Sequence, residues 1–142
     1  MRLVCETDIE APIEKTAKLL GNPANAIKWM QGLTDYKQIS GEPGAPGATF
    51  CFIGETNFDG RIISRDLPNE FTFTLEGRDT FVTVTAKLSV LSPTKTHYTL
   101  DQEFKFTGAS GGTAGPHVLT TIKERQHKDV QDFKRFVEAQ PS

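Results

Sequence analysis

The side chains that could carry acid–base or metal chemistry are few in this sequence. Histidine is the usual general base near neutral pH, and the chain holds three, His97, His117 and His127. His97 lies on the opposite strand face from Tyr98, so we expect it to point to solvent, and we expect a surface position for His117. No histidine or cysteine spacing typical of a metal site occurs, so we predict no metal and no cofactor.

Polar residues interrupt apolar faces at three positions that could face a ligand. Gln102 interrupts the apolar face of a strand, and Gln126 and Asp129 interrupt the apolar stripe of a helix. Burying such groups without partners costs about 1–3 kcal/mol. We therefore expect the helical pair at an open rim, with an interior position facing ligand or water as the alternative. Tyr98 could offer its hydroxyl to a ligand, although a packed tyrosine with one hydrogen bond is the simpler interpretation.

A glycine-rich stretch at residues 108–115 invites comparison with phosphate-binding loops. It lacks the lysine and the serine or threonine that contact phosphate and Mg²⁺ in those loops. We interpret it as a mobile connection into the following helix, which could also gate a pocket. No Gly-x-Ser-x-Gly elbow occurs, so a serine hydrolase is not expected.

The strands that must position these residues are visible as alternating apolar and polar side chains. This alternation, broken by short turns, predicts an antiparallel sheet with one face in water. We expect about seven strands, over residues 2–10, 33–40, 48–54, 58–66, 71–76, 80–91 and 98–106.

Three helices are predicted, two of them short and directly after the first strand. The first closes at Gly21, and the second is capped by Asn22, carries Trp29 and stops at Gly32. A long helix over about 113–139 has an apolar stripe that includes Val118, Ile122, Phe133 and Phe136. Such a stripe must pack on the sheet, which can curl around it and leave a concave pocket between them.

Composition limits the classes of protein that this chain can represent. Its 142 residues fit one domain, residues 1–142, and its net charge of −2 gives no sign of nucleic-acid binding. No run is long and apolar enough to cross a membrane, and no signal peptide is recognised. The two cysteines, Cys5 and Cys51, could form a disulfide but need not, and we expect a cytoplasmic protein.

Several short motifs, in order, resemble those of one superfamily. They are Ile9-Glu10-Ala11-Pro12-Ile13-Glu14, the segment 24–33 with Trp29-Met30, Gly47-Ala48-Thr49-Phe50, and the segment 61–70 followed by Phe71-Thr72-Phe73. The chain thereby resembles the START/Bet v 1-like superfamily, also called SRPBCC or polyketide-cyclase-like proteins. The resemblance implies an α+β helix-grip fold, in which a curved antiparallel sheet surrounds a long C-terminal helix.

The same resemblance implies a ligand class but no single activity. Members include carriers, hormone receptors, cyclases and chaperone activators, and fold alone does not decide among them. We expect binding of a hydrophobic small molecule or lipid, with no nucleic-acid partner. The alternatives are a polyketide cyclase or dehydratase acting on an aromatic or polyketide-type substrate, with Tyr98, Gln102 and Asp129 as its candidate groups, and, third, a chaperone-activator-like module.

A cavity between the helix and the sheet would be lined by inward-facing side chains. Large aromatic residues can line such a cavity or fill it, and ten phenylalanines leave both possibilities open. The predicted lining residues are Trp29, Phe50, Phe52, Phe71, Phe73, Val84, Tyr98, Leu100, Gln102, Val118, Ile122, Gln126 and Phe133.

Overall fold

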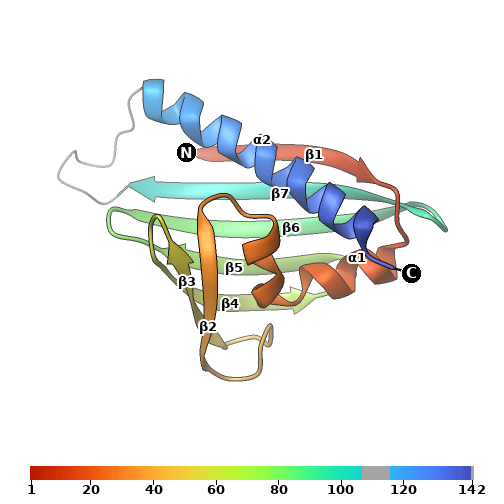
Figure 1. The fold of residues 1–142 in the computed structure, drawn as a ribbon, viewed down its shortest axis with the longest axis horizontal. Coiled ribbons are helices and arrows are strands. Elements are labelled where there is room, and N and C mark those ends of the chain that lie inside the picture. The colour runs from red at the N-terminus through yellow and green to blue at the C-terminus, as the bar shows by residue number, and fades with distance from the viewer. Residues whose placement is uncertain (107–115, 142) are drawn as a thin grey trace.

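In the described part of the chain, seven strands pair in one antiparallel sheet that curls around the C-terminal helix (Figure 1). The computed structural model describes residues 1–106 and 116–141. The strands follow the order β1-β7-β6-β5-β4-β3-β2 in the sheet. Their bounds are Arg2–Ile9 (β1), Leu33–Ser40 (β2), Thr49–Gly54 (β3), Phe58–Asp66 (β4), Glu70–Glu76 (β5), Thr80–Ser92 (β6) and Lys95–Phe106 (β7). The predicted helix-grip fold class is confirmed.

The two short helices follow β1, as expected, but the second is shorter and tighter than predicted. Helix α1 spans Ile13–Leu20, and a 3₁₀ helix, η1, spans Pro23–Lys28. The Asn22 side chain caps η1 by accepting a hydrogen bond from the Ala24 amide at 3.2 Å. The expected extension to Gly32 is wrong, because Trp29 leaves the helical conformation and packs its ring against Phe133.

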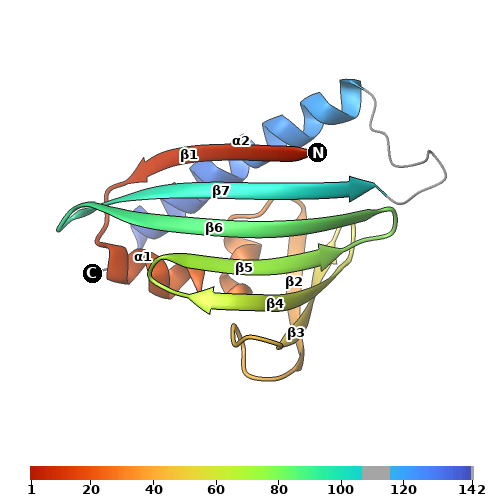
Figure 2. The same cartoon turned by 180° about the vertical axis from the view of Figure 1, so that it is seen from behind.

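The long helix α2 spans Pro116–Ala139 and lies across the concave face of the sheet (Figure 1). Seen from behind, the strands lie in front of it (Figure 2). Val130, Phe133 and Val137 are fully buried, whereas Val118 is 44% exposed and Ile122 is half-buried. The predicted apolar stripe is therefore packed tightly only in the C-terminal half of the helix. The predicted gating loop and the first residues of the predicted helix lie outside the described residues.

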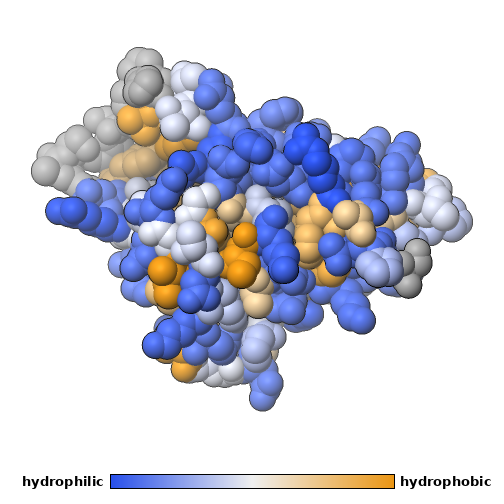
Figure 3. Space-filling model, viewed as in Figure 1, coloured by the Kyte–Doolittle hydropathy of each residue, from blue (hydrophilic) through white to orange (hydrophobic). Residues whose placement is uncertain are grey.

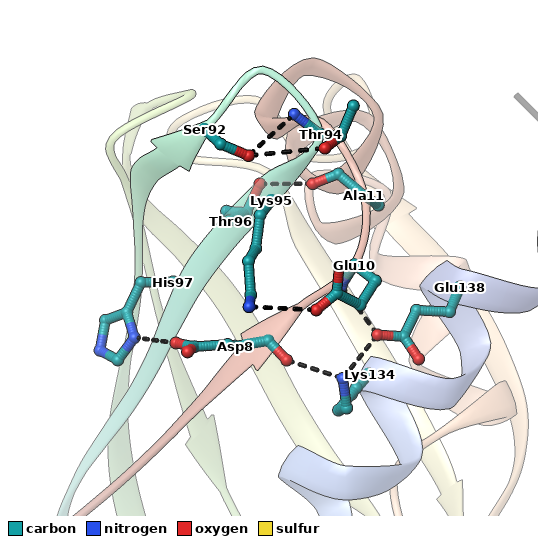
Figure 4. Close-up of polar contacts among 10 residues, drawn as sticks. All are labelled: Asp8, Glu10, Ala11, Ser92, Thr94, Lys95, Thr96, His97, Lys134 and Glu138. Atoms are coloured by element: carbon teal, nitrogen blue, oxygen red, sulfur yellow. Dashed lines mark hydrogen bonds and ion pairs between the residues drawn. The ribbon is translucent and has the colours of Figure 1, made fainter.

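Polar contacts tie the C-terminal half of α2 to the edge of the sheet (Figure 4). The Lys134 ammonium donates to the Asp8 carbonyl oxygen at 2.7 Å, and the Glu138 carboxylate accepts from the Glu10 amide at 2.8 Å. On the outer face, His97 Nδ1 lies 2.8 Å from an Asp8 carboxylate oxygen. The contacts of Lys134 and Glu138 anchor this end of the helix on β1 and the residue that follows it.

Aromatic rings fill the space between the sheet, α1 and η1. The ring centroids of Phe50 and Phe52 are 4.9 Å apart, and those of Phe71 and Phe73 are 5.7 Å apart. Trp29 meets Phe133 at 5.1 Å with its ring edge-on. Only about 10 Å³ of free space remains among these side chains, which is about the least that a single water molecule needs. Here the large aromatic residues fill the interior.

Candidate functional site

An apolar cavity of about 260 Å³ lies between the first half of α2 and the sheet. Its size is just below the range of roughly 300–1,000 Å³ typical of ligand pockets, so it suits a small ligand. Figure 3 shows hydrophobic residues at the surface beside the first turns of α2. The apolar lining residues are Met30, Leu33, Phe58, Leu75, Val82, Phe104, Phe106, Val118 and Ile122.

The cavity is built from elements that are distant in the sequence. Strand alternation brings Phe58, Leu75, Val82 and Phe104 to the concave face from four neighbouring strands. The helix supplies its side chains at a spacing of three or four residues, which places them on one face. The turn between η1 and β2 contributes the remaining wall. The cavity therefore depends on the sheet's curvature and on where α2 crosses it.

Among the described residues, Asp129 is the one carboxylate that lines this cavity. It is 5% exposed, and its Oδ1 atom accepts a hydrogen bond from the Gln31 amide at 2.9 Å. Burial raises the pKa of Asp129 to about 6, and the nearby negative charge of Asp132 adds to the rise. The Gln31 hydrogen bond and the positive charges of Arg125 and Lys128 act in the opposite direction. A buried carboxyl group of this kind can bind or exchange a proton near neutral pH.

Gln126 is 4% exposed and fastens the helix to two strands. Its Nε2 atom donates to the carbonyl oxygens of Leu3, at 2.9 Å, and Leu100, at 3.4 Å. The expectation that Gln126 and Asp129 lie at an open rim is wrong, because both are buried and line the cavity. Each offsets part of the cost of burial by bonding to a backbone group.

Gln102 lines the cavity from the middle of β7 and is 8% exposed. Its neighbours across the two adjacent strands are Leu3 and Val84. Within the part of the chain that the structure describes, its side-chain amide makes no hydrogen bond. An amide in this position can both donate and accept, so it could bind a polar group of a ligand.

Tyr98 lies four residues before Gln102 on the same face of β7, but it does not line the cavity. Its ring packs on Phe133 with centroids 4.7 Å apart, and among the described residues its hydroxyl has no hydrogen-bond partner. Burial raises the pKa of Tyr98, and the negative charge of Asp129 raises it further. Tyr98 is therefore a neutral, packed side chain.

Arg125 lies at the solvent side of the cavity. Its Nη2 atom is 3.7 Å from Glu55 Oε2, which joins α2 to the turn between β3 and β4. Both side chains are exposed, so this ion pair contributes little to stability.

The predicted lining residues fall into three groups. Gln102, Val118, Ile122 and Gln126 line the 260 Å³ cavity. The five aromatic residues around the 10 Å³ void are Trp29, Phe50, Phe52, Phe71 and Phe73. The four that pack in the core without lining either space are Val84, Tyr98, Leu100 and Phe133. A ligand contact by the last two groups stays a prediction.

The sequence prediction missed most of the apolar wall. Val82 and Leu75 are in phase with the predicted Val84 and Phe73, so alternation shows that they face inward. Alternation does not show which end of a strand lies over open space. The missed strand residues lie in one region, the end of the sheet that the first half of α2 covers.

Other candidate groups lie away from the cavity. His97 is on the outer face between Asp8 and Glu6, whose hydrogen bonds raise its pKa. His127 is exposed, with Nδ1 3.8 Å from the sulfur of Cys5. Both cysteines are free, and burial raises the pKa of the Cys5 thiol. The side chain of His117 lies outside the described part of the structure.

A second hollow, of about 440 Å³, lies on the outer face of the sheet. It is more open than the inner cavity, and charged side chains, including Asp59, Arg61 and Glu76, line it. Within residues 1–106 and 116–141, no three histidine, cysteine or carboxylate side chains gather closely enough to hold a metal ion.

Comparisons with known proteins identify the fold. Models of known families give no match to the sequence, and neither do curated protein sequences. Among solved structures, a START superfamily protein from Mycobacterium smegmatis superposes with a TM-score of 0.81 at 13% identity, over 96% of this chain and 97% of that one. The chain has the START/Bet v 1-like fold.

Two further structures share this START/Bet v 1-like fold. The ginseng major latex-like protein 151 from Panax ginseng gives a TM-score of 0.75 at 15% identity and 96% coverage of each chain. The ZhuI aromatase/cyclase from Streptomyces sp. R1128 gives 0.79 at 11% identity, over 97% of this chain and 93% of that one. At such low identity the likeness establishes the fold and leaves the activity open.

No helix among the described residues is long and apolar enough to cross a membrane. The single domain, the cytoplasmic location and the lack of a nucleic-acid partner stay predictions from composition.

Proposed function

We propose that this protein binds a hydrophobic small molecule or lipid in the cavity between the sheet and the first half of α2. The observation that supports the proposal is the 260 Å³ space itself, which persists beside a tightly filled aromatic core. Protein interiors are normally packed with few voids larger than a water molecule, so an apolar cavity of this size favours a ligand.

Within this proposal, the ligand contacts come from the cavity wall. Val82, Phe104 and Ile122 supply apolar surface from two strands and the helix. Gln102 and Asp129 are polar points that can orient the ligand. The aromatic residues between the sheet and α1 give the rigid base against which this wall is held.

Binding of N-phenyl-1-naphthylamine, a neutral apolar fluorescent probe, tests the proposal. We expect saturable binding at one site per chain. Val82→Phe adds a ring to the cavity wall and should weaken binding at least tenfold, whereas Thr83→Phe places the same ring on the outer face of β6 and should leave binding unchanged. The absence of saturable binding, or equal loss in both variants, would contradict the proposal.

A second candidate function is acid–base catalysis on an aromatic or polyketide-type substrate. Asp129 favours it, because a cavity-lining carboxyl group with a raised pKa is typical of general acids. The solved aromatase/cyclase of the same fold provides an analogy. Mass spectrometry of compounds extracted from the purified protein separates the two functions. A carrier should yield the same compound from the wild type and from Asp129→Asn, whereas an enzyme should accumulate unconverted substrate only in the variant.

A further inference from the structure

Two polar side chains that line the cavity have atoms without a hydrogen-bond partner among the described residues. Gln102 presents an amide with no partner among the described residues, from a side chain that is 8% exposed. Buried polar groups in folded proteins are normally hydrogen-bonded, so an unpartnered amide facing a cavity is available to bind a partner there.

Asp129 offers a second free atom in the same cavity. Its Oδ1 atom is occupied by the Gln31 amide, and no hydrogen bond to Oδ2 is found within the described part of the chain. Gln126, the neighbouring polar side chain, uses its amide N–H groups on the carbonyls of Leu3 and Leu100. Two groups with free hydrogen-bonding capacity thus line the cavity, an amide on the sheet and a carboxylate oxygen on the helix; the side chains of Gln31, Thr80 and Arg125 also line the cavity.

We propose that the cavity selects a small apolar compound carrying a hydroxyl group, an alcohol or a phenol, which accepts from the Gln102 amide and donates to the Asp129 carboxylate. This inference rests on the proposed function and names its ligand class. A hydroxyl group both donates and accepts, so it satisfies the two side chains together. A ligand carboxylate would place a second negative charge beside Asp129, and the Arg125 guanidinium, which also lines the cavity, is exposed and paired with Glu55, so it offsets that repulsion only in part.

Three probes of matched shape test the selectivity at pH 8, where the Asp129 carboxylate is charged. They are 2-naphthol, naphthalene and 2-naphthoate, each measured by displacement of N-phenyl-1-naphthylamine. Two hydrogen bonds of roughly 0.5–1.5 kcal/mol each predict that 2-naphthol binds about tenfold or more tightly than naphthalene. We expect 2-naphthoate to bind more weakly than naphthalene.

Variants decide whether Gln102 and Asp129 cause the preference. Gln102→Leu removes the amide at nearly constant volume and should bring the ratio of the 2-naphthol and naphthalene affinities to about one. Asp129→Asn keeps an acceptor for the Gln31 amide and should lower the ratio several-fold. Tyr98→Phe is the matched control, because it removes the other unpartnered polar atom of this strand face, which does not line the cavity.

The outcomes separate the two proposals. Equal binding of 2-naphthol and naphthalene by the wild type, tighter binding of 2-naphthoate, or an unchanged ratio in both Gln102→Leu and Asp129→Asn overturns the hydroxyl selectivity alone. Failure of the fluorescent probe and of all three naphthalene compounds to bind overturns the proposed function as well.

Discussion

At the scale of single residues, Asp129 shows how burial changes the chemistry of a side chain. Its position on α2 removes it from water, while Gln31 provides a single backbone hydrogen bond. One hydrogen bond does not replace full hydration, so the neutral acid is favoured and the pKa rises to about 6. The charged form of Asp129, at the wall of the cavity, therefore lowers the stability of the folded protein.

The stability of the folded protein should depend on the protonation of Asp129. Its pKa is higher in the folded protein than the ordinary value of 3.8, so the folded state binds the proton more tightly. Stability from this group is therefore lost as the pH rises from about 4 to about 6. A pKa difference of this size corresponds to at most about 3 kcal/mol. We expect Asp129→Asn to raise the free energy of unfolding at pH 8 by about 1–3 kcal/mol.

Urea denaturation at pH 8 and pH 4.5 measures this effect. The gap between Asp129→Asn and the wild type should shrink at the lower pH, where the wild-type carboxyl group is protonated in the folded state. Asp59→Asn, at an exposed position on the outer face, is the control and should show a small effect at both values. An equal gap at the two pH values would count against the argument.

At the scale of elements, the pairing of β3 with β4 shows how a glycine allows an aromatic core. Gly60 lies directly opposite Phe50 in this pair. The Phe50 ring occupies the place that a Gly60 side chain would take, since an added Cβ atom would lie closer than 3.0 Å to ring carbons. Because Gly60 has no side chain, the Phe50 ring can lie close to the β4 backbone and contact Phe52 and Phe73.

Replacing this glycine should therefore destabilise the sheet. We expect Gly60→Ala to lower the free energy of unfolding by about 1–3 kcal/mol, the usual cost of overpacking a core. Chemical denaturation measures the change. Phe50→Leu makes room for the new methyl group, so Gly60→Ala should cost less in that background than in the wild type. Additive costs of the two substitutions would show that the ring does not set the penalty.

At the scale of the whole molecule, the two ends of the concave face differ in how tightly their side chains are packed. Under α1 and η1, aromatic rings leave about 10 Å³ of free space, and Val130, Phe133 and Val137 in the C-terminal half of α2 are fully buried. Under the first half of α2, about 260 Å³ remains. The well-packed end is also the one where Lys134 binds the backbone of Asp8 in β1 and Glu138 binds the backbone of Glu10 just after it (Figure 4). The molecule thus combines a rigid support with a cavity.

This difference predicts unequal local stability along α2. Residues with buried side chains and anchoring hydrogen bonds open less often than residues over a cavity. We expect backbone amides of residues 130–138 to exchange hydrogen more slowly than those of 118–125. N-phenyl-1-naphthylamine should slow exchange in the second group most. Peptide-resolved mass spectrometry measures both effects, and uniform protection along the helix would contradict the prediction.

The sequence determined the order of strands and helices and which side chains face inward. Its alternation placed Val84, Gln102 and Phe73 on the concave face because neighbouring strand residues point to opposite sides. It also located the polar interruptions Gln126 and Asp129. These are local properties, since they depend on residues close together in the chain.

Only the tertiary structure decided which inward-facing residues surround free space. Phe73 and Leu75 have the same orientation on β5, yet Phe73 interlocks with other rings while Leu75 lines the cavity. The difference arises from sheet curvature and from where α2 crosses, which join residues far apart in sequence. The same packing buried Asp129, which the local pattern placed at a rim.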